Sequence, residues 1–342
     1  MAALLLACSN APLENTSLPT ASTTIIARPV AETTTSLAPS TTTAAAPSLV
    51  DQLRSTRIEP LPPLSDGRPA TFVGVTDDYA AVEVDTLTGE IVRPIAQIAT
   101  AADVANAECA ACINAVDQVW RLADGSAFLV SECCEPASGS MFWADATAEP
   151  VTPENHSHEG RGLNAWYAEP APSGPFVATA GYFPGLISYD GSINWSPVNS
   201  ELQYAASPPA WSWDLSTLFV LVKDAREAPP VLTTAELDSD LLYTTELSWW
   251  SADTYPSGLA LSTVGLLISF ELSYHNTSGR VVIFRPDGTF VRDFPIEVGS
   301  SLGGFDPTGT FLIYVDGDGT VHWHDTVDRF GSLAEEFIFA SW

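Results

Sequence analysis

Basic residues are scarce in this sequence. Lysine and arginine together account for 13 of 342 residues, against 42 aspartates and glutamates, so the net charge is −29, and Lys223 is the only lysine. Such a surface repels phosphate backbones and anionic lipid headgroups, so we expect no nucleic-acid partner and no electrostatic attachment to a membrane. It attracts cations and basic partners, although solubility or a saline habitat is the more ordinary explanation of the charge.

Long apolar runs and familiar catalytic motifs are also missing. No stretch of 18 apolar residues occurs, so we expect no membrane-spanning helix, and short runs such as 264–270 have the length of buried strands. The sequence contains no G-x-S-x-G, H-E-x-x-H or P-loop motif. Hydrophobic residues nevertheless make up 46% of the chain and aromatic residues 10%, which is enough for a folded core.

The first residues look like an export signal. The run Leu5-Leu6-Ala7-Cys8 resembles the bacterial lipobox, in which a cysteine follows a small residue at the end of a signal peptide. The resemblance implies that Cys8 carries a lipid and that the protein lies outside the cytoplasmic membrane of a bacterium, anchored to the envelope through that lipid alone. A basic stretch and a full-length apolar region, which normally precede a lipobox, are missing here.

The next segment has the composition of a tether. Residues 9–50 are rich in threonine, serine, proline and alanine, with no hydrophobic period. A segment of this kind cannot bury enough apolar surface to offset the loss of conformational entropy on ordering, so we expect it to be disordered. The predicted organisation is therefore a signal-peptide end at 1–8, a disordered tether at 9–50, and one folded domain at 51–342.

Five cysteines are present, and an odd number in an exported protein needs an explanation. Lipidation of Cys8 leaves four within 26 residues, and we expect these to form two disulfides with a pairing that the sequence cannot decide. A tetrahedral zinc site is the weaker alternative, because adjacent cysteines in a strand point to opposite faces. The predicted disulfide residues are Cys109, Cys112, Cys133 and Cys134.

The remainder of the chain repeats with a period near 45 residues. Each copy has a turn with Asp, Gly, Ser or Pro, an apolar strand, and a second turn and strand. Copies begin at residues 77, 124, 172, 214, 262 and 307. This is the length of one four-stranded blade, so the sequence predicts an all-β fold, a single β-propeller with six blades and its last strand (334–342) closing the ring. Seven blades, with extra strands from 51–70, is the alternative, and a pair of β-sandwiches fits less well.

The turns between these strands point to a superfamily. The phrases P-D-G-T at 286–289, D-P-T-G-T at 306–310 and D-G-D-G-T at 316–320 are the turn vocabulary of propeller repeats. Over residues 60–342 the sequence resembles TolB-like and WD40-like bacterial propellers, at the level of the superfamily only, because no strict Trp-Asp signature is present.

Aromatic residues near the expected turns are candidate ligand contacts. Stacked aromatic rings beside carboxylates can hold sugars or cationic groups, although tryptophan between blades is more often core. The candidates are Tyr182, Phe183, Trp211, Trp213, Trp249 and Trp250.

Metal sites are less well supported. His156 and His158 lie beside two glutamates and His322 and His324 alternate in an expected strand, but ordinary surface histidines are the default. Asp316 opens a segment like the start of a calcium loop, yet Val327 stands where that loop needs a glutamate, which favours a tight turn. We therefore expect no metal and no cofactor.

These observations favour a monomeric binding or scaffolding module held outside the cell membrane. Its partner would be a protein or a small ligand, of cationic character if the acidic surface selects it. The alternatives are an extracytoplasmic enzyme, for instance a metal-assisted hydrolase at the mouth of the channel, and a structural part of an envelope assembly.

Overall fold

A computed structural model describes residues 48, 63–107, 115–122, 125–131, 140–144, 167–171, 176–180, 184–188, 194–195, 206–223, 228–239, 241–273, 279–297, 299–325 and 329–342. The chain divides into two compact units, Met1–Pro47 and Ser48–Trp342, and all of these residues belong to the second. No helix among them is long and apolar enough to cross a membrane.

The described fold is almost entirely strand. Its one helix, α2 (Ala101–Asn106), begins at Thr100, whose side chain accepts a hydrogen bond from the Asp103 amide in a capping box. The strands are β1 (Thr71–Thr76), β2 (Ala80–Asp85), β3 (Ile91–Gln97), β4 (Gln118–Arg121), β5 (Ala127–Ser131), β6 (Ser140–Ala144), β7 (Tyr167–Pro170), β8 (Phe176–Ala180), β9 (Pro184–Ser188), β10 (Asn194–Trp195), β11 (Ala210–Trp211), β12 (Thr217–Val222), β13 (Val231–Glu236), β14 (Leu241–Glu246), β15 (Thr254–Leu261), β16 (Leu267–Ser273), β17 (Gly279–Phe284), β18 (Phe290–Ile296), β19 (Ser301–Phe305), β20 (Phe311–Val315), β21 (Val321–Asp325), β22 (Phe330–Ala334) and β23 (Phe337–Ser341).

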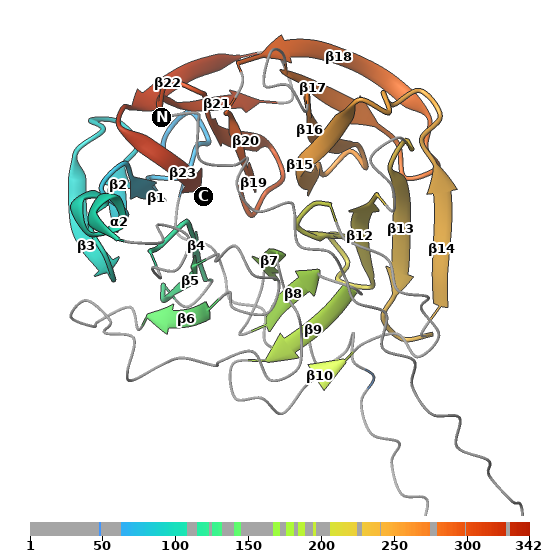
Figure 1. Cartoon of the computed structure of the whole chain (residues 1–342), viewed down its shortest axis with the longest axis horizontal. Helices are drawn as coiled ribbons and strands as arrows, with labels where there is room; N and C mark the ends of the chain where they lie inside the picture. Colours follow the sequence, from blue (N-terminus) through green and yellow to red (C-terminus); the bar gives the residue numbers. More distant parts are fainter. Residues whose placement is uncertain are drawn as a thin grey trace, which may run out of the picture. The chain divides into compact units, whose positions relative to one another are not determined.

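These strands form antiparallel sheets that resemble propeller blades (Figure 1). Within the described residues, five sheets have four strands each, in the orders β23-β1-β2-β3, β10-β9-β8-β7, β11-β12-β13-β14, β15-β16-β17-β18 and β19-β20-β21-β22, and one has three, β4-β5-β6. Four of the four-stranded sheets are meanders of consecutive strands, as expected for blades.

The end of the chain completes the sheet at its beginning. Strand β23 pairs antiparallel with β1, with Gly74 opposite Ala340 and Val73 opposite Ser341, and Figure 1 shows the two strands together. The predicted closing strand is therefore confirmed. One consequence was not foreseen from the sequence. Because β23 is the innermost strand of the first sheet, the repeat copy at residue 77 supplies its two outer strands, β2 and β3, whereas the copies at 172, 214, 262 and 307 supply the two middle strands of their sheets.

The hydrophobic core lies between successive sheets. Alternate residues of β1 face opposite ways, so Val73 and Val75 pack on the sheet of β4 and β5 while Phe72 packs on the sheet of β20 and β21. Three more clusters join the sheets of β8 and β12, of β12 and β16, and of β16 and β20. A sheet that is buried on both faces favours apolar residues on both faces of a strand, and β12, in which Leu218, Phe219, Val220, Leu221 and Val222 are all buried, has this composition.

The turns depend on aspartate side chains. Asp316 Oδ1 accepts hydrogen bonds from the amides of Asp318 (3.0 Å) and Thr320 (2.9 Å), and Gly319 takes a positive φ of 84°. In a similar way, Oδ1 of Asp306 accepts hydrogen bonds from the backbone amides of Thr310 and Phe311. The segment at 316–320 is thus the tight turn between β20 and β21 that the sequence predicted.

Candidate ligand cavity

The innermost strands surround a cavity of about 390 Å³. Every described sheet contributes to its wall, through β23, β4, β7, β15, β19 and the residues that flank β11 and β12. The lining residues are Gln118, Trp120, Glu169, Ala206, Pro208, Lys223, Tyr255, Pro256, Ser257, Gly258, Leu259, Ser301, Leu302, Gly303, Gly304 and Phe339. Because loops and inner strands of many sheets meet here, a ligand in this cavity would contact the whole domain at once.

Glycines allow the inner strands to come this close. A Cβ added to Gly303 would lie 1.6 Å from the carbonyl oxygen of Ala340, so β19 can approach β23 only without a side chain at this position. Gly258 has a φ of +76°, and its added Cβ would lie 2.5 Å from Cβ of Leu302. The Ser269 hydroxyl donates to the Gly258 carbonyl at 2.6 Å and fixes this part of the wall.

Glu169 is one of the residues that line the cavity. It lies on β7, where its backbone carbonyl accepts a hydrogen bond from Nε1 of Trp211 at 3.2 Å. Burial raises the pKa of its side chain well above the usual range. Among the described residues no cation lies close enough to oppose that rise.

Lys223, the only lysine of the sequence, also lines the cavity. Its Nζ donates to the carbonyl oxygens of Ala228 (2.6 Å) and Ala252 (3.0 Å). Burial lowers the pKa of this lysine, and the charges of Glu271 and Asp253 oppose that effect. The lysine charge is therefore already balanced within the protein.

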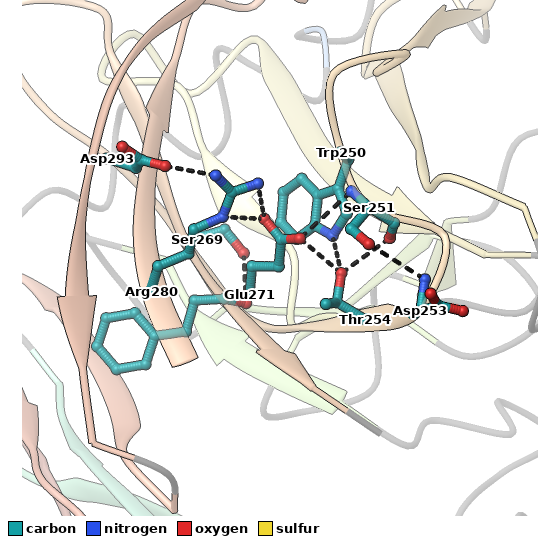
Figure 2. Close-up of polar contacts among 9 residues, drawn as sticks. Trp250, Ser251, Asp253, Thr254, Ser269, Glu271, Arg280 and Asp293 are labelled. Atoms are coloured by element: carbon teal, nitrogen blue, oxygen red, sulfur yellow. Dashed lines mark hydrogen bonds and ion pairs between the residues drawn. The ribbon is translucent and has the colours of Figure 1, made fainter. Parts of the chain in front are cut away.

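A polar network holds the segment that Lys223 binds. Glu271, which is 2% exposed, lies with Oε2 2.6 Å from Nε of Arg280 and with Oε1 2.6 Å from the Thr254 hydroxyl (Figure 2). The amide of Ser251 donates to the same Oε1 at 3.3 Å. The carboxylate on β16 thus fixes residues 251–254 at the start of β15, and with them the Ala252 carbonyl.

The tryptophans proposed as ligand contacts lie in the packing between sheets. Trp211 is 4% exposed and Trp250 is 3% exposed, and Nε1 of Trp250 donates to the Thr254 hydroxyl at 3.0 Å. Trp249 packs on Phe284 and Phe290, and its Nε1 donates to the Gly288 carbonyl at 2.8 Å. Trp213 is partly buried beside the same cluster. None of the four lines the cavity.

The described histidines are held by local contacts. Nε2 of His322 lies 2.6 Å from Oδ2 of Asp316, and its ring stacks on Tyr314. His324 contacts the Asp325 carbonyl at 2.6 Å and stacks on Phe294. Within the described part of the chain, no group of three potential metal-ligating side chains comes together.

Several predicted positions fall outside the described residues and stay predictions. They are the lipid-anchor residue Cys8, the disulfide residues Cys109, Cys112, Cys133 and Cys134, the metal candidates His156 and His158, and the ligand candidates Tyr182 and Phe183. The cavity residues were missed from the sequence. Lys223 offered one usable signal, as the only lysine of an acidic chain, whereas nothing local distinguishes Glu169 from the other carboxylates.

Comparison with known proteins gives likeness to solved structures only. No protein-family model and no curated protein matches this chain. BamB from Moraxella catarrhalis superposes with a TM-score of 0.40 at 16% identity, over 78% of this chain and 70% of its own. A structure of the mitotic checkpoint complex gives 0.46 at 13%, over 78% and 72%. Dipeptidyl peptidase 4 from Porphyromonas gingivalis gives 0.37 at 12%, over 85% and 56%. The likeness of the sheets to propeller blades follows from the strand topology described above.

Proposed function

We propose that this protein is a non-catalytic binding module that takes a small ligand into the cavity between its inner strands. The observation that supports this most is the composition of the wall. All the described sheets contribute to it, and its lining residues include one glutamate, one lysine and three aromatic residues around a space of about 390 Å³. Pockets of this size with a few convergent polar groups are the usual form of small-molecule sites.

The wider setting of the module is part of the same proposal. We infer a six-bladed propeller held outside the cytoplasmic membrane by a lipid on Cys8, with residues 9–50 as the tether. Two disulfides among the four remaining cysteines fit an oxidising compartment. The repeat period and the closing contact of β23 with β1 support six blades.

The single lysine provides a direct test of the binding site. Protein grown with ¹³C-labelled lysine gives one Cε–Hε signal, that of Lys223 in the cavity wall. We expect this signal to shift when small cationic, anionic, neutral and sugar compounds are added in turn and one of them enters the cavity. The full chain is used, and the measurement is a two-dimensional NMR titration.

A filled cavity is the control. Ser257→Trp places an indole in the cavity wall, while Ser239→Trp adds the same bulk at an exposed turn. We expect Ser239→Trp to keep the ligand-induced shift and Ser257→Trp to lose it, with both variants folded by circular dichroism. A shift that persists in Ser257→Trp, or a Lys223 signal that none of the compounds moves, contradicts the proposal.

A further inference from the structure

We propose that the ligand of this cavity is a small organic cation, an amine or quaternary ammonium compound, whose positive charge pairs with the carboxylate of Glu169 and rests against the aromatic side chains of the wall. This inference depends on the proposed binding function and adds the chemical class of the ligand. It follows from the charges on the wall, from the aromatic rings beside them and from the charge of the whole chain.

The two charged groups of the wall differ in what surrounds them. The ammonium of Lys223 donates to two backbone carbonyls and lies in the field of Glu271 and Asp253, so its charge is compensated inside the protein. Glu169 has no described cation near it. Burial keeps the Glu169 carboxyl protonated in the absence of a ligand, and a ligand that brings a positive charge would stabilise its ionised form. Among the described lining residues, Glu169 is therefore the ionisable group with which the positive charge of a ligand could pair.

The rest of the wall suits an organic cation better than a metal ion. Trp120, Tyr255 and Phe339 line the cavity, and the rings of Trp120 and Phe339 lie 5.1 Å apart in an edge-to-face contact. The faces of aromatic rings attract ammonium groups through the ring quadrupole. Calcium needs six to eight oxygen ligands, and the lining residues described include one carboxylate. The chemistry present thus matches an alkylammonium group.

The net charge of the whole chain also favours a cationic ligand. With a net charge of −29, the protein raises the local concentration of cations and lowers that of anions. An anionic ligand would meet this field on approach, and inside the cavity it could not stabilise the ionised form of Glu169. Among the described lining residues, only Lys223 would favour an anionic ligand, and its ammonium already donates to two backbone carbonyls.

Choline and its neutral isostere 3,3-dimethylbutan-1-ol separate charge from shape. Titrations of the full chain with choline, tetramethylammonium and butylammonium are followed by the Lys223 signal and by calorimetry. We expect at least one of the three to bind, and choline to bind at least about tenfold more tightly than the isostere, because a desolvated charge pair is lost with the neutral compound. In Glu169→Gln this difference should disappear, whereas Lys223→Met should keep it.

The outcomes distinguish this inference from the binding function itself. Equal affinity of choline and its isostere, an unchanged difference in Glu169→Gln, or binding of acetate in place of all three cations would overturn the cationic ligand while the Lys223 shift still supported a binding cavity. If no probe shifted the Lys223 signal, both proposals would fail. Glu169→Asp is the control, because it changes the same position and keeps the carboxyl group. It should still bind choline more tightly than the isostere, which would show that the effect of Glu169→Gln comes from the lost charge and not from a fold defect.

Discussion

A buried carboxyl group resists ionisation, and Glu169 is in this position with no cation near it among the described residues. Its folded pKa is raised above the ordinary value of 4.5 by burial, so the folded state holds a proton that the unfolded chain has already released. The unfolding free energy contributed by this residue is therefore highest below pH 4.5 and falls as the pH rises towards the folded pKa.

Glu169→Gln tests that sign. The amide does not titrate, so we expect the stability of the variant relative to wild type to increase with pH above the ordinary glutamate value, by at most about 1.4 kcal/mol per pH unit. Urea unfolding of both proteins, at about one pH value per unit between about pH 4 and pH 8, gives the unfolding free energy of each as a function of pH. Lys223 and Tyr255, the other titratable groups described on the wall, are common to both proteins. Parallel curves would show that Glu169 is not buried as described.

Glu271 is the residue on which the segment before β15 depends. Replacing it by glutamine removes the charge that Arg280 and the Thr254 hydroxyl share. We expect Glu271→Gln to lower the unfolding free energy by about 1–3 kcal/mol, because the groups around it remain buried. Asp293→Asn removes the other, 38% exposed partner of Arg280 and should cost less than about 1 kcal/mol. Equal losses in urea unfolding would contradict the distinction.

At the scale of elements, β23 carries more of the fold than its five residues suggest. It pairs with β1, its Ser341 hydroxyl donates to the Val119 carbonyl at 2.7 Å, and its Phe339 packs on Trp120. One strand thus joins the first sheet to the next and also lines the cavity. Loss of its packing should loosen the closure of the domain.

Adjacent residues of β23 provide a matched pair. Phe339 is 5% exposed and Ile338 is 36% exposed. We expect Phe339→Ala to lower the unfolding free energy by about 3–5 kcal/mol and Ile338→Ala by less than about 1 kcal/mol. Chemical denaturation monitored by tryptophan fluorescence measures both. Similar costs for the two variants would mean that β23 is not seated as the structure places it.

The strands could be predicted from the sequence because each repeat contains recognisable turn residues at the ends of its strands. Asp316 and Gly319 mark the turn between β20 and β21 locally, and the apolar run of β12 marks a strand buried on both faces. The order of strands in the first sheet was harder to predict. Because β23 takes the innermost place, β2 and β3 become the outer strands, and the pairing of Gly74 with Ala340 leaves no local signal in the sequence.

The cavity could not be predicted for the same reason. Glu169, Lys223 and Tyr255 come from three separate sheets and meet only after the sheets have packed. Trp211 and Trp250 attracted attention as ligand contacts because tryptophan serves both cores and binding sites, and the structure places these two in the core. Their indole N–H groups are bonded within the protein.

At the scale of the whole molecule, the envelope setting makes a prediction about mass. Protein purified from the membranes of a bacterial host should begin at Cys8, carry a lipid, and gain about 4 Da on reduction as two disulfides open. Cys8→Ser should remove the lipid and release the protein from the membrane fraction while the change on reduction stays the same. Free thiols with bound zinc, or a chain without lipid, would contradict the exported, anchored protein.

The central claim is that the cavity between the inner strands holds a small organic cation beside Glu169, and one crystallographic measurement tests it directly. Crystals of the full chain are soaked with arsenocholine, and arsenic is located by its anomalous scattering. The account predicts an arsenic peak inside the cavity, next to the Glu169 carboxylate and the rings of Trp120 and Tyr255, and no such peak in crystals of Glu169→Gln. Arsenic confined to the acidic outer surface, with the cavity unoccupied, would contradict it.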